Sequence, residues 1–251
     1  MTHPLDRPIW SALTTRQADI AERVSGAVRL RPEYGVFAAA ADATEPSRIA
    51  LNYLDIGPEG LWCLERDPVE PPPGLLITHH SAPCVQMVAD HVIAPKPEFE
   101  VLRLGEDEAP AMLALARLTE PGPFFEHTHR MGNFIGVKAR DLLIAMAGER
   151  LRPEGYTEVS GVCTHPDFRG RGFAGGLMRI VAARILARGE VPFLHSYAEN
   201  RAAIALYETL GFRLRSTMTL TVLTKPDFGA SVAGHGAVGH GIAGHSVIGH
   251  G

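Results

Sequence analysis

Residues 162–174 carry the most informative pattern in the chain: Val162-Cys163-Thr164-His165-Pro166-Asp167-Phe168-Arg169-Gly170-Arg171-Gly172-Phe173-Ala174. We expect a strand over 157–164 and a long amphipathic helix over 172–188, because apolar residues in the second range recur with the 3.6-residue period. Glycines at the turn let a ligand approach the backbone, and the free amide groups of a helix's first turn favour an anion. Arg169 and Arg171 add positive charge there. The turn therefore predicts a pyrophosphate-binding loop.

Two common nucleotide-binding loops do not fit this turn. It has no Gly-Lys-Ser/Thr ending, and its glycines lack the G-x-G-x-x-G spacing with a following acidic residue. The pattern Arg169-x-x-Gly172-x-Ala174 instead resembles the pyrophosphate loop of the GNAT (GCN5-related N-acetyltransferase) superfamily. A second phrase, about thirty residues on, resembles the segment that closes the cofactor site in that superfamily: Asn200-x-x-Ala203-x-x-x-Tyr207-Glu208-x-Leu210-Gly211-Phe212.

The resemblance covers about residues 98–224 and looks most like the branch related to the glycine N-acyltransferase C-terminal domain. It implies an α/β (α+β) fold, with a mixed, mostly antiparallel central sheet that opens in a V-shaped splay and is flanked by helices. We divide the chain into a smaller N-terminal α/β domain (1–96), an acetyltransferase domain (97–225) and a Gly/His-rich disordered tail (226–251). The first domain faintly resembles a degenerate half of the same fold and carries no catalytic motif.

Local patterns predict the individual elements. Thr14 and Gln17 have capping-box spacing, which predicts a helix after Thr14 that ends at Gly26. In the second domain we expect, in order, a strand at 99–104, a helix at 107–118, tightly joined strands at 133–138 and 141–150, the strand and helix around the loop, a strand at 192–197, a helix at 200–210 and one or two strands within 212–223.

The resemblance also implies how acetyl-CoA, the acyl-donor cosubstrate, is held. The backbone of Val162 and Thr164, with Cys163 between them, would pair with the pantetheine arm as an added strand does. Asn200 would reach the same arm from the next helix. The pyrophosphate would be held by Arg169, Gly170, Arg171, Gly172, Phe173, Ala174 and Gly175. No metal is expected in the reaction.

Tyr207 matches the tyrosine that protonates the departing thiolate in many relatives, a step that needs a proton donor. A phenol with its ordinary pKa near 10 carries its proton at neutral pH. The alternative is that Tyr207 lies on the apolar face of an amphipathic helix and only packs in the protein core.

Glu158 is the candidate general base, because some relatives place a catalytic glutamate at this point of the strand. It lies four residues before Val162, so regular strand alternation would put both side chains on one face. The alternative is an exposed acidic residue at the start of a strand.

Weaker candidates lie in the loop that follows Pro121-Gly122-Pro123, where relatives shape the acceptor pocket. Phe124, Phe125 and Arg130 are candidate lining residues. His127 and His129 either bind substrate, act as a base or are solvated loop histidines. Cys163 alternates away from Val162 and is interpreted as a buried strand cysteine; His195, before Asn200, is interpreted as a packed histidine.

Composition limits the setting and the partners. The net charge is −4 and the arginines are scattered, so no nucleic-acid footprint is present. No run of eighteen apolar residues suggests a membrane span, and three widely spaced cysteines fit a reducing cytoplasm. Homodimerisation is left open. In the tail, Gly-His recurs every five residues, at His235, His240, His245 and His250, which indicates disorder or, alternatively, binding of a soft divalent metal.

The leading hypothesis is therefore an N-acyltransferase that moves an acetyl group from acetyl-CoA to a primary amine by direct attack. The acceptor is a small molecule, an amino acid or a protein amine. The alternative is a non-catalytic CoA-binding sensor or interaction module, and a third reading, a metal-handling protein, has no support outside the tail.

Overall fold

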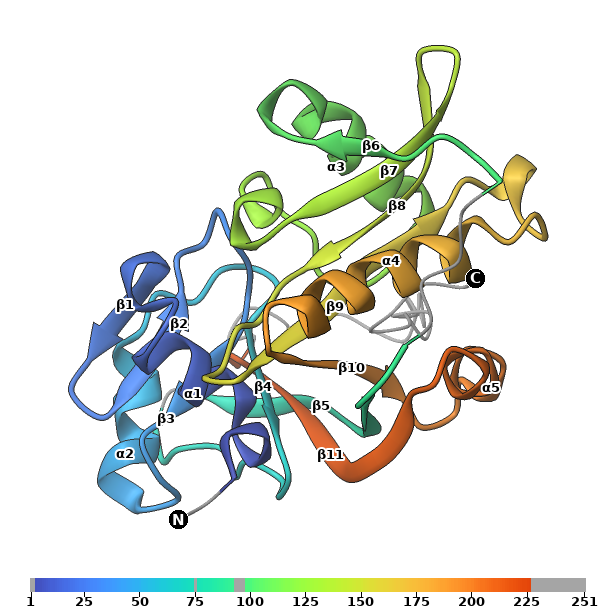
Figure 1. The fold of residues 1–251 in the computed structure, drawn as a ribbon. Helices are drawn as coiled ribbons and strands as arrows, with labels where there is room; N and C mark the ends of the chain where they lie inside the picture. The colour runs from blue at the N-terminus through green and yellow to red at the C-terminus, as the bar shows by residue number, and fades with distance from the viewer. Residues whose placement is uncertain (1–2, 75, 93–97, 227–251) are drawn as a thin grey trace, which may run out of the picture.

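One large sheet organises the chain, whose computed structural model describes residues 3–74, 76–92 and 98–226 (Figure 1). Its eight strands have the order β4-β11-β5-β10-β9-β8-β7-β6, and only the β9–β10 pair is parallel. The strands span Leu61–Glu65 (β4), Ile77–Val88 (β5), Leu102–Leu104 (β6), Phe134–Ala139 (β7), Leu142–Glu149 (β8), Tyr156–Thr164 (β9), Val191–Tyr197 (β10) and Arg213–Thr224 (β11). The predicted mixed, mostly antiparallel sheet is confirmed.

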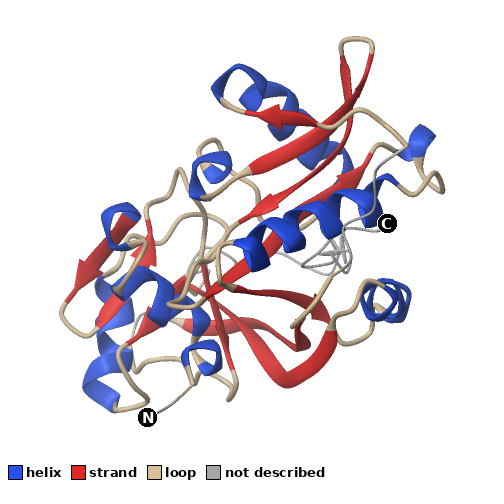
Figure 2. Cartoon of the chain, in the orientation of Figure 1, coloured by secondary structure: helices blue, strands red, loops and turns tan. Residues whose placement is uncertain are grey.

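Helices cover both faces of this sheet (Figure 2). Helix α4 (Phe173–Ala187) packs on one face over β8, β9 and β10, while α3 (Ala109–Thr119) packs on the other over β8 and β9. Helix α5 (Arg201–Thr209) follows β10 and joins the α4 side. Short 3-10 turns lie at Glu106–Glu108, Thr128–Met131 and Pro166–Phe168. These bounds confirm the predicted helices of the second domain to within a few residues.

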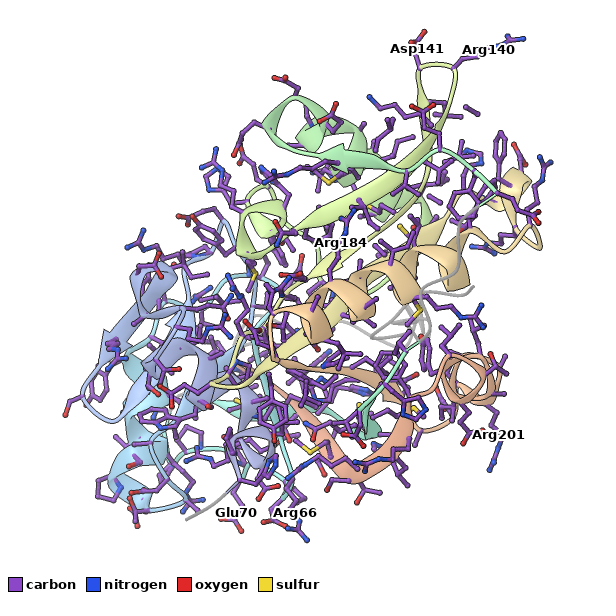
Figure 3. The ribbon with its side chains drawn as sticks, in the orientation of Figure 1. Arg66, Glu70, Arg140, Asp141, Arg184 and Arg201 are labelled. Carbon is purple, nitrogen blue, oxygen red and sulfur yellow. The ribbon has the colours of Figure 1, made fainter. Side chains whose placement is uncertain are left out.

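Strands β7 and β8 form the tight hairpin that the sequence predicts. Its two-residue turn, Arg140-Asp141, lies at the projecting tip of the molecule (Figure 3). In the part of the chain that the structure describes, we find no helix with the length and apolarity that a membrane crossing requires.

Residues 3–53 form a compact module on the α3 side of β4, β10 and β11. It contains α1 (Pro8–Thr14), α2 (Glu45–Ala50), 3-10 turns at Pro4–Asp6, Ala18–Ile20 and Leu51–Tyr53, and a small antiparallel sheet of β1 (Ala21–Val24), β2 (Ala27–Leu30) and β3 (Ala38–Ala40). Many of its apolar side chains share one buried cluster with Leu151 of the β8–β9 connection, Phe193 and Met218. The module is thus part of the same core as the main sheet.

The helix expected after Thr14 is wrong, because the helix ends at Thr14 and residues 21–24 form a strand. Pro8 occupies the first turn, where a missing amide hydrogen is tolerated. Thr14 Oγ1 donates back to the Trp10 carbonyl, 2.7 Å away, and caps nothing. Gln17 is used over long range: its side chain donates to the Arg150 carbonyl at 2.8 Å and accepts from the Arg152 amide at 2.9 Å.

The most consequential feature of the topology is the place of β5. This strand comes from the first third of the chain, yet it lies between β10 and β11 and pairs antiparallel with both. Strand β4 then pairs with the outer edge of β11. Residues on both sides of position 96 therefore share one sheet, while the division of the chain into domains stays a prediction. The Gly-His repeats lie outside the described residues.

Candidate functional site

The main sheet opens between its two parallel strands. Strands β9 and β10 are registered at only three positions, from Val191↔Tyr156 to Phe193↔Glu158. Beyond them β9 continues beside β8 to Thr164, and β10 continues beside β5 to Tyr197. Each strand keeps its outer partner, so the inner edges diverge, as Figure 1 shows. Beyond the last registered pair, the inner edges of β9 and β10 no longer pair with each other. An extended ligand can form main-chain hydrogen bonds with such edges.

Two buried hydroxyl groups mark this opening. Thr164 Oγ1 on β9 and Ser196 Oγ on β10 are buried and find no hydrogen-bond partner among the described residues. Both residues lie on the diverging parts of their strands. A buried polar atom without a partner usually indicates a missing water or ligand group, because leaving it unsatisfied costs free energy. The opening therefore suits a polar, extended ligand.

A β-bulge reorients the end of β9. Gly148 pairs with Ser160 and Met146 with Cys163, so two residues of β9 oppose one residue of β8. The extra residue is Gly161, whose φ of 61° lies in the left-handed region. A Cβ there would meet the Phe134 ring at 2.8 Å, so glycine is required on two grounds.

The bulge corrects the sequence argument that Glu158 and Val162 share one face. Val159 and Val162 both pack in the core under α4, whereas Glu158 lies on the other face with His195. Cys163 joins the core under α3 and is fully buried, as expected for a packed strand cysteine. Burial raises the pKa of its thiol to about 12, so it is not a nucleophile at neutral pH.

The predicted pyrophosphate loop leads into α4 with an open helix start. Gly172 is the residue before the helix; its φ is 78°, and a Cβ there would meet nothing within 4 Å. The glycine is therefore needed for backbone conformation, and space is left above it. No side chain caps the helix, and its first i→i−4 bond comes from the Gly176 amide to the Gly172 carbonyl at 3.0 Å. The amide groups of Phe173, Ala174 and Gly175 are thus available to an anion.

Positive charge surrounds this helix start. Arg169 and Arg171 are both exposed on the loop. The Arg171 guanidinium lies 5.0 Å from the centre of the Phe168 ring and donates to the Asp167 carbonyl at 3.3 Å. His165 caps the 3-10 turn of the loop through Nδ1, which accepts from the Asp167 amide at 3.3 Å, so it is a turn residue.

Helix α5 brings the second motif to the same side of the sheet. Asn200 precedes the helix and caps it, since its Oδ1 accepts from the Ala203 amide at 3.2 Å. Tyr207 is 1% exposed and packs in the cluster that contains Val162 and Leu194. Burial raises the pKa of its phenol above the ordinary value. The hydroxyl therefore stays protonated at neutral pH, in the core that adjoins the opening.

Glu158 is locked into a buried ion pair. Its two carboxylate oxygens accept from Arg150 Nε and Nη2, both at 2.9 Å, and from His195 Nδ1 at 2.8 Å. Glu158 itself is 0% exposed. Burial alone would raise its pKa, but the Arg150 charge and the hydrogen bond from His195 outweigh this and hold the pKa at about 2. A carboxylate so engaged is a poor proton acceptor, so the geometry disfavours it as the base.

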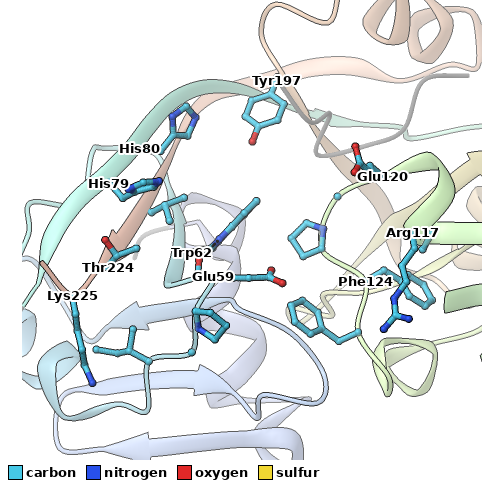
Figure 4. A pocket seen from close by; sticks show the side chains of 18 residues that line it. Glu59, Trp62, His79, His80, Arg117, Glu120, Phe124, Tyr197, Thr224 and Lys225 are labelled. Carbon is cyan, nitrogen blue, oxygen red and sulfur yellow. Dashed lines mark hydrogen bonds between the residues drawn. The ribbon is translucent and has the colours of Figure 1, made fainter. Parts of the chain in front are cut away.

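A cavity of about 780 Å³ adjoins the opening on the α3 side (Figure 4). Its walls come from the segment before β4, the ends of β5, β10 and β11, and the loop after α3. Its lining includes Glu59, Trp62, Phe124, Phe125 and Tyr197. Phe124 links the cavity to the bulge, because it lies 3.6 Å from the Cβ position of Gly161. We call this space the acceptor cavity, because its wall includes part of the loop following 121–123, which the sequence resemblance assigns to the acceptor pocket.

The loop candidates divide into two groups. Phe124 and Phe125 line this cavity, whereas His127, His129 and Arg130 do not. His129 is buried, with Nδ1 3.0 Å from the Glu126 carbonyl, and Arg130 pairs with Glu106 at 2.6 Å. His129 is therefore not a solvated loop histidine. His195 is packed, as expected.

Sequence reasoning missed the wall that residues before position 96 contribute. Glu59, Trp62 and the pair His79-His80 belong to no recognisable motif, and only long-range pairing of β4 and β5 with β11 brings them here. The only local signal in the sequence is the Gly-Pro-Glu-Gly stretch at 57–60, whose composition indicates a turn. Within the described residues, no group of three or more His, Cys, Asp or Glu side chains is arranged to hold a metal ion.

Comparison with known proteins agrees with this architecture. A family model described as FR47-like protein matches residues 134–221. A solved structure from Novosphingobium aromaticivorans, assigned to the GNAT family of acetyltransferases, is 47% identical; the match covers 90% of this chain and all of that chain, with a TM-score of 0.80. The chain belongs to the GNAT family.

More distant relatives support the fold alone or match only a short part of the chain. A GCN5-related N-acetyltransferase from Kribbella flavida is 18% identical over 85% of this chain and 94% of that chain, with a TM-score of 0.59, which shows a shared fold. An acetyltransferase of Yersinia enterocolitica is 41% identical over 58 residues, 22% of this chain. That match spans only 40% of the Yersinia protein's length. The predicted relation to glycine N-acyltransferases stays a prediction.

Proposed function

We propose that the protein is an acetyl-CoA-dependent N-acetyltransferase that acts on a primary amine. The observation that carries this proposal is the opening between β9 and β10. The start of α4, preceded by Gly172, lies beside it, and the acceptor cavity lies on the opposite face of the sheet. Such a passage lets two substrates enter from opposite sides and meet within the sheet. Membership of the GNAT family supports the same reaction.

The residues around the passage fit acetyl-CoA, which supplies an activated thioester. We assign the pyrophosphate to the amide groups at the start of α4 and to Arg169 and Arg171, where no Cβ or capping side chain fills the space. We assign the pantetheine arm to the open edge of β9 at 162–164, with Asn200 on the far side. Thr164 Oγ1, which is buried without a partner in the described chain, offers that arm a further hydrogen bond.

We assign the proton donor for the leaving thiolate to Tyr207. The phenol is on the α4 side of the sheet, next to the opening, and its raised pKa keeps the proton on oxygen until the sulfur develops charge. No hydrogen bond joins its hydroxyl to another described residue, so the group is free to bind the thioester sulfur. The competing role, core packing alone, predicts no loss of turnover in a phenylalanine variant.

The first test is thermal melting with and without acetyl-CoA, followed by a thiol-release assay with primary amines. Binding to the native state should raise the melting temperature by mass action, by an amount that grows with acetyl-CoA concentration. A rise with amine-dependent thiol release supports the enzyme. A rise without thiol release for any amine supports the non-catalytic CoA-binding module instead, and no rise contradicts both.

A further inference from the structure

No residue has so far been assigned as the general base. The acceptor cavity contains a carboxylate, that of Glu59, which has no assigned role. Glu59 lies in the turn before β4, and Figure 4 shows its carboxylate pointing into the cavity, with Trp62 beside it and Phe124 across from it. The remaining titratable or charged groups around the cavity are His79 and His80 from β5, Tyr197 from β10, Arg117 and Glu120 from the end of α3, and Lys225 after β11. Glu59 forms no hydrogen bond or ion pair with any of them, nor with another described residue, through its carboxylate.

The turn that carries Glu59 is held in place by its backbone. The Gly60 amide donates to the Gly57 carbonyl at 3.1 Å, and Trp62 Nε1 donates to the Glu59 carbonyl at 3.0 Å. Gly60 packs so tightly on β11 that a Cβ would lie 2.5 Å from the Leu223 carbonyl oxygen. The carboxylate is therefore presented by a fixed turn and not by a loose loop, which is what a catalytic group requires.

The surroundings of this carboxylate suit proton transfer. Glu59 keeps access to solvent through the mouth of the cavity, and the partial desolvation of its carboxylate by the cavity walls raises its pKa above the ordinary glutamate value. A carboxylate with a raised pKa accepts a proton more readily than Glu158, whose pKa is held low by Arg150. Trp62, Phe124, Phe125 and Tyr197 supply aromatic walls that attract a cationic amine and pack against an apolar body.

Resting on the proposed function, we propose that Glu59 is the general base that takes the proton of the acceptor amine, and that the acceptors are arylalkyl primary amines. The amine enters as an ammonium ion and gives one proton to the Glu59 carboxylate. The nitrogen lone pair then forms the C–N bond with the thioester carbon. The nitrogen loses its second proton to solvent as the amide forms. The C–S bond breaks, and the leaving sulfur takes the proton of Tyr207. Tyr207 then regains a proton from solvent, and Glu59 releases to solvent the proton that it took from the amine.

The test compares Glu59→Gln with wild type, using acetyl-CoA and 2-phenylethylamine as probes. The glutamine keeps size and polarity but cannot accept the proton. We expect kcat at pH 7 to fall about 100-fold or more, within the range measured for loss of a general base. The acetyl-CoA-dependent rise in melting temperature should not change. Glu70→Gln is the matched control, because Glu70 is a surface residue (side chain 78% exposed) in the same part of the chain.

The pH profile separates a base from a residue that merely fills the cavity. In wild type, kcat should fall as the pH drops through the raised pKa of Glu59, because the protonated acid cannot accept a proton. In Glu59→Gln this acidic limb should disappear, and the deficit should shrink at high pH, where the amine arrives already deprotonated. Unchanged kcat, or a rise in KM alone with the acidic limb kept, would overturn the proposal.

Failure of the proposed function looks different. A wild-type protein whose melting temperature ignores acetyl-CoA contradicts acetyl transfer itself. A wild-type protein that binds acetyl-CoA but releases no thiol with 2-phenylethylamine, while acetylating other amines, overturns the acceptor class and the role of Glu59 drawn from it.

Discussion

His195 Nδ1 lies 2.8 Å from Glu158 Oε1, and Glu158 belongs to the last registered pair of β9 and β10, where its partner is Phe193. The proton position follows from Gln86 on the neighbouring strand. Its Oε1 accepts from Arg215 Nη1 at 2.8 Å, so its Nε2 must donate, both to the Leu5 carbonyl and to His195 Nε2 at 2.9 Å. His195 Nε2 is therefore the acceptor from Gln86, and the hydrogen on Nδ1 is donated to Glu158. This chain of buried groups ties the N-terminal module to the strands that form the opening.

Glu158→Gln should destabilise the protein, because it leaves the Arg150 guanidinium buried without its counter-charge. Breaking one partner of a buried ion pair costs about 3–5 kcal/mol, which urea unfolding at pH 7 would measure. The folded pKa of about 2 lies below the unfolded value, so the stabilisation is present above the ordinary glutamate pKa. It is lost as the pH falls from that value towards 2.

The difference in the free energy of unfolding between wild type and Glu158→Gln should therefore become smaller as the pH falls from 5 to 2. A difference that is constant across this range would contradict the ion-pair account. Glu70→Gln removes the acidic partner of the surface ion pair with Arg48. Its free energy of unfolding should differ little from that of wild type at every pH.

Gly172→Glu should abolish acetyl-CoA binding, because it adds bulk and negative charge where we place the pyrophosphate. Calorimetry should detect no binding at concentrations that saturate wild type. Gly105→Glu is the control, since Gly105 also has nothing within 4 Å of its Cβ position but lies before α3. Equal affinity in the two variants would move the pyrophosphate away from α4.

Tyr207→Phe should lower kcat without changing acetyl-CoA affinity, because it removes only the proton donor. We expect a fall of about 100-fold, the lower end for general acid catalysis. Steady-state kinetics and calorimetry on the same preparation would separate the two effects. Turnover equal to wild type would return Tyr207 to a packing role in the core under α4.

Gly161→Ala should destabilise the bulge in β9. The new Cβ requires both a left-handed backbone and displacement of the Phe134 ring, so we expect a loss of about 1–3 kcal/mol. Gly155→Ala is the matched control: Gly155 also has a positive φ, of 76°, but nothing lies within 4 Å of its Cβ position. Chemical denaturation should rank Gly161→Ala as the less stable variant, and the reverse order would contradict the crowding at Phe134.

Much of the second domain was predictable, because its signals are local. The apolar period of 174–186 produces α4, Gly189 ends it with a φ of 76°, and the Arg140-Asp141 turn joins β7 to β8. The missed features arise from contacts between distant residues. The apparent capping box at Thr14 and Gln17 failed because Gln17 bonds to residues more than 130 positions away.

Local signals specify the loop into α4, the helices and the positions along the chain of the strands after residue 97, because helix periodicity and glycine backbone freedom act between near neighbours. Tertiary contacts place β5 between β10 and β11, turn Glu158 away from Val162 through a bulge, and bring Glu59 into the acceptor cavity. Strand pairing joins segments far apart in the chain through backbone groups that all residues share. It therefore leaves little trace in side-chain pattern, and the acceptor side of the site is built from such pairings.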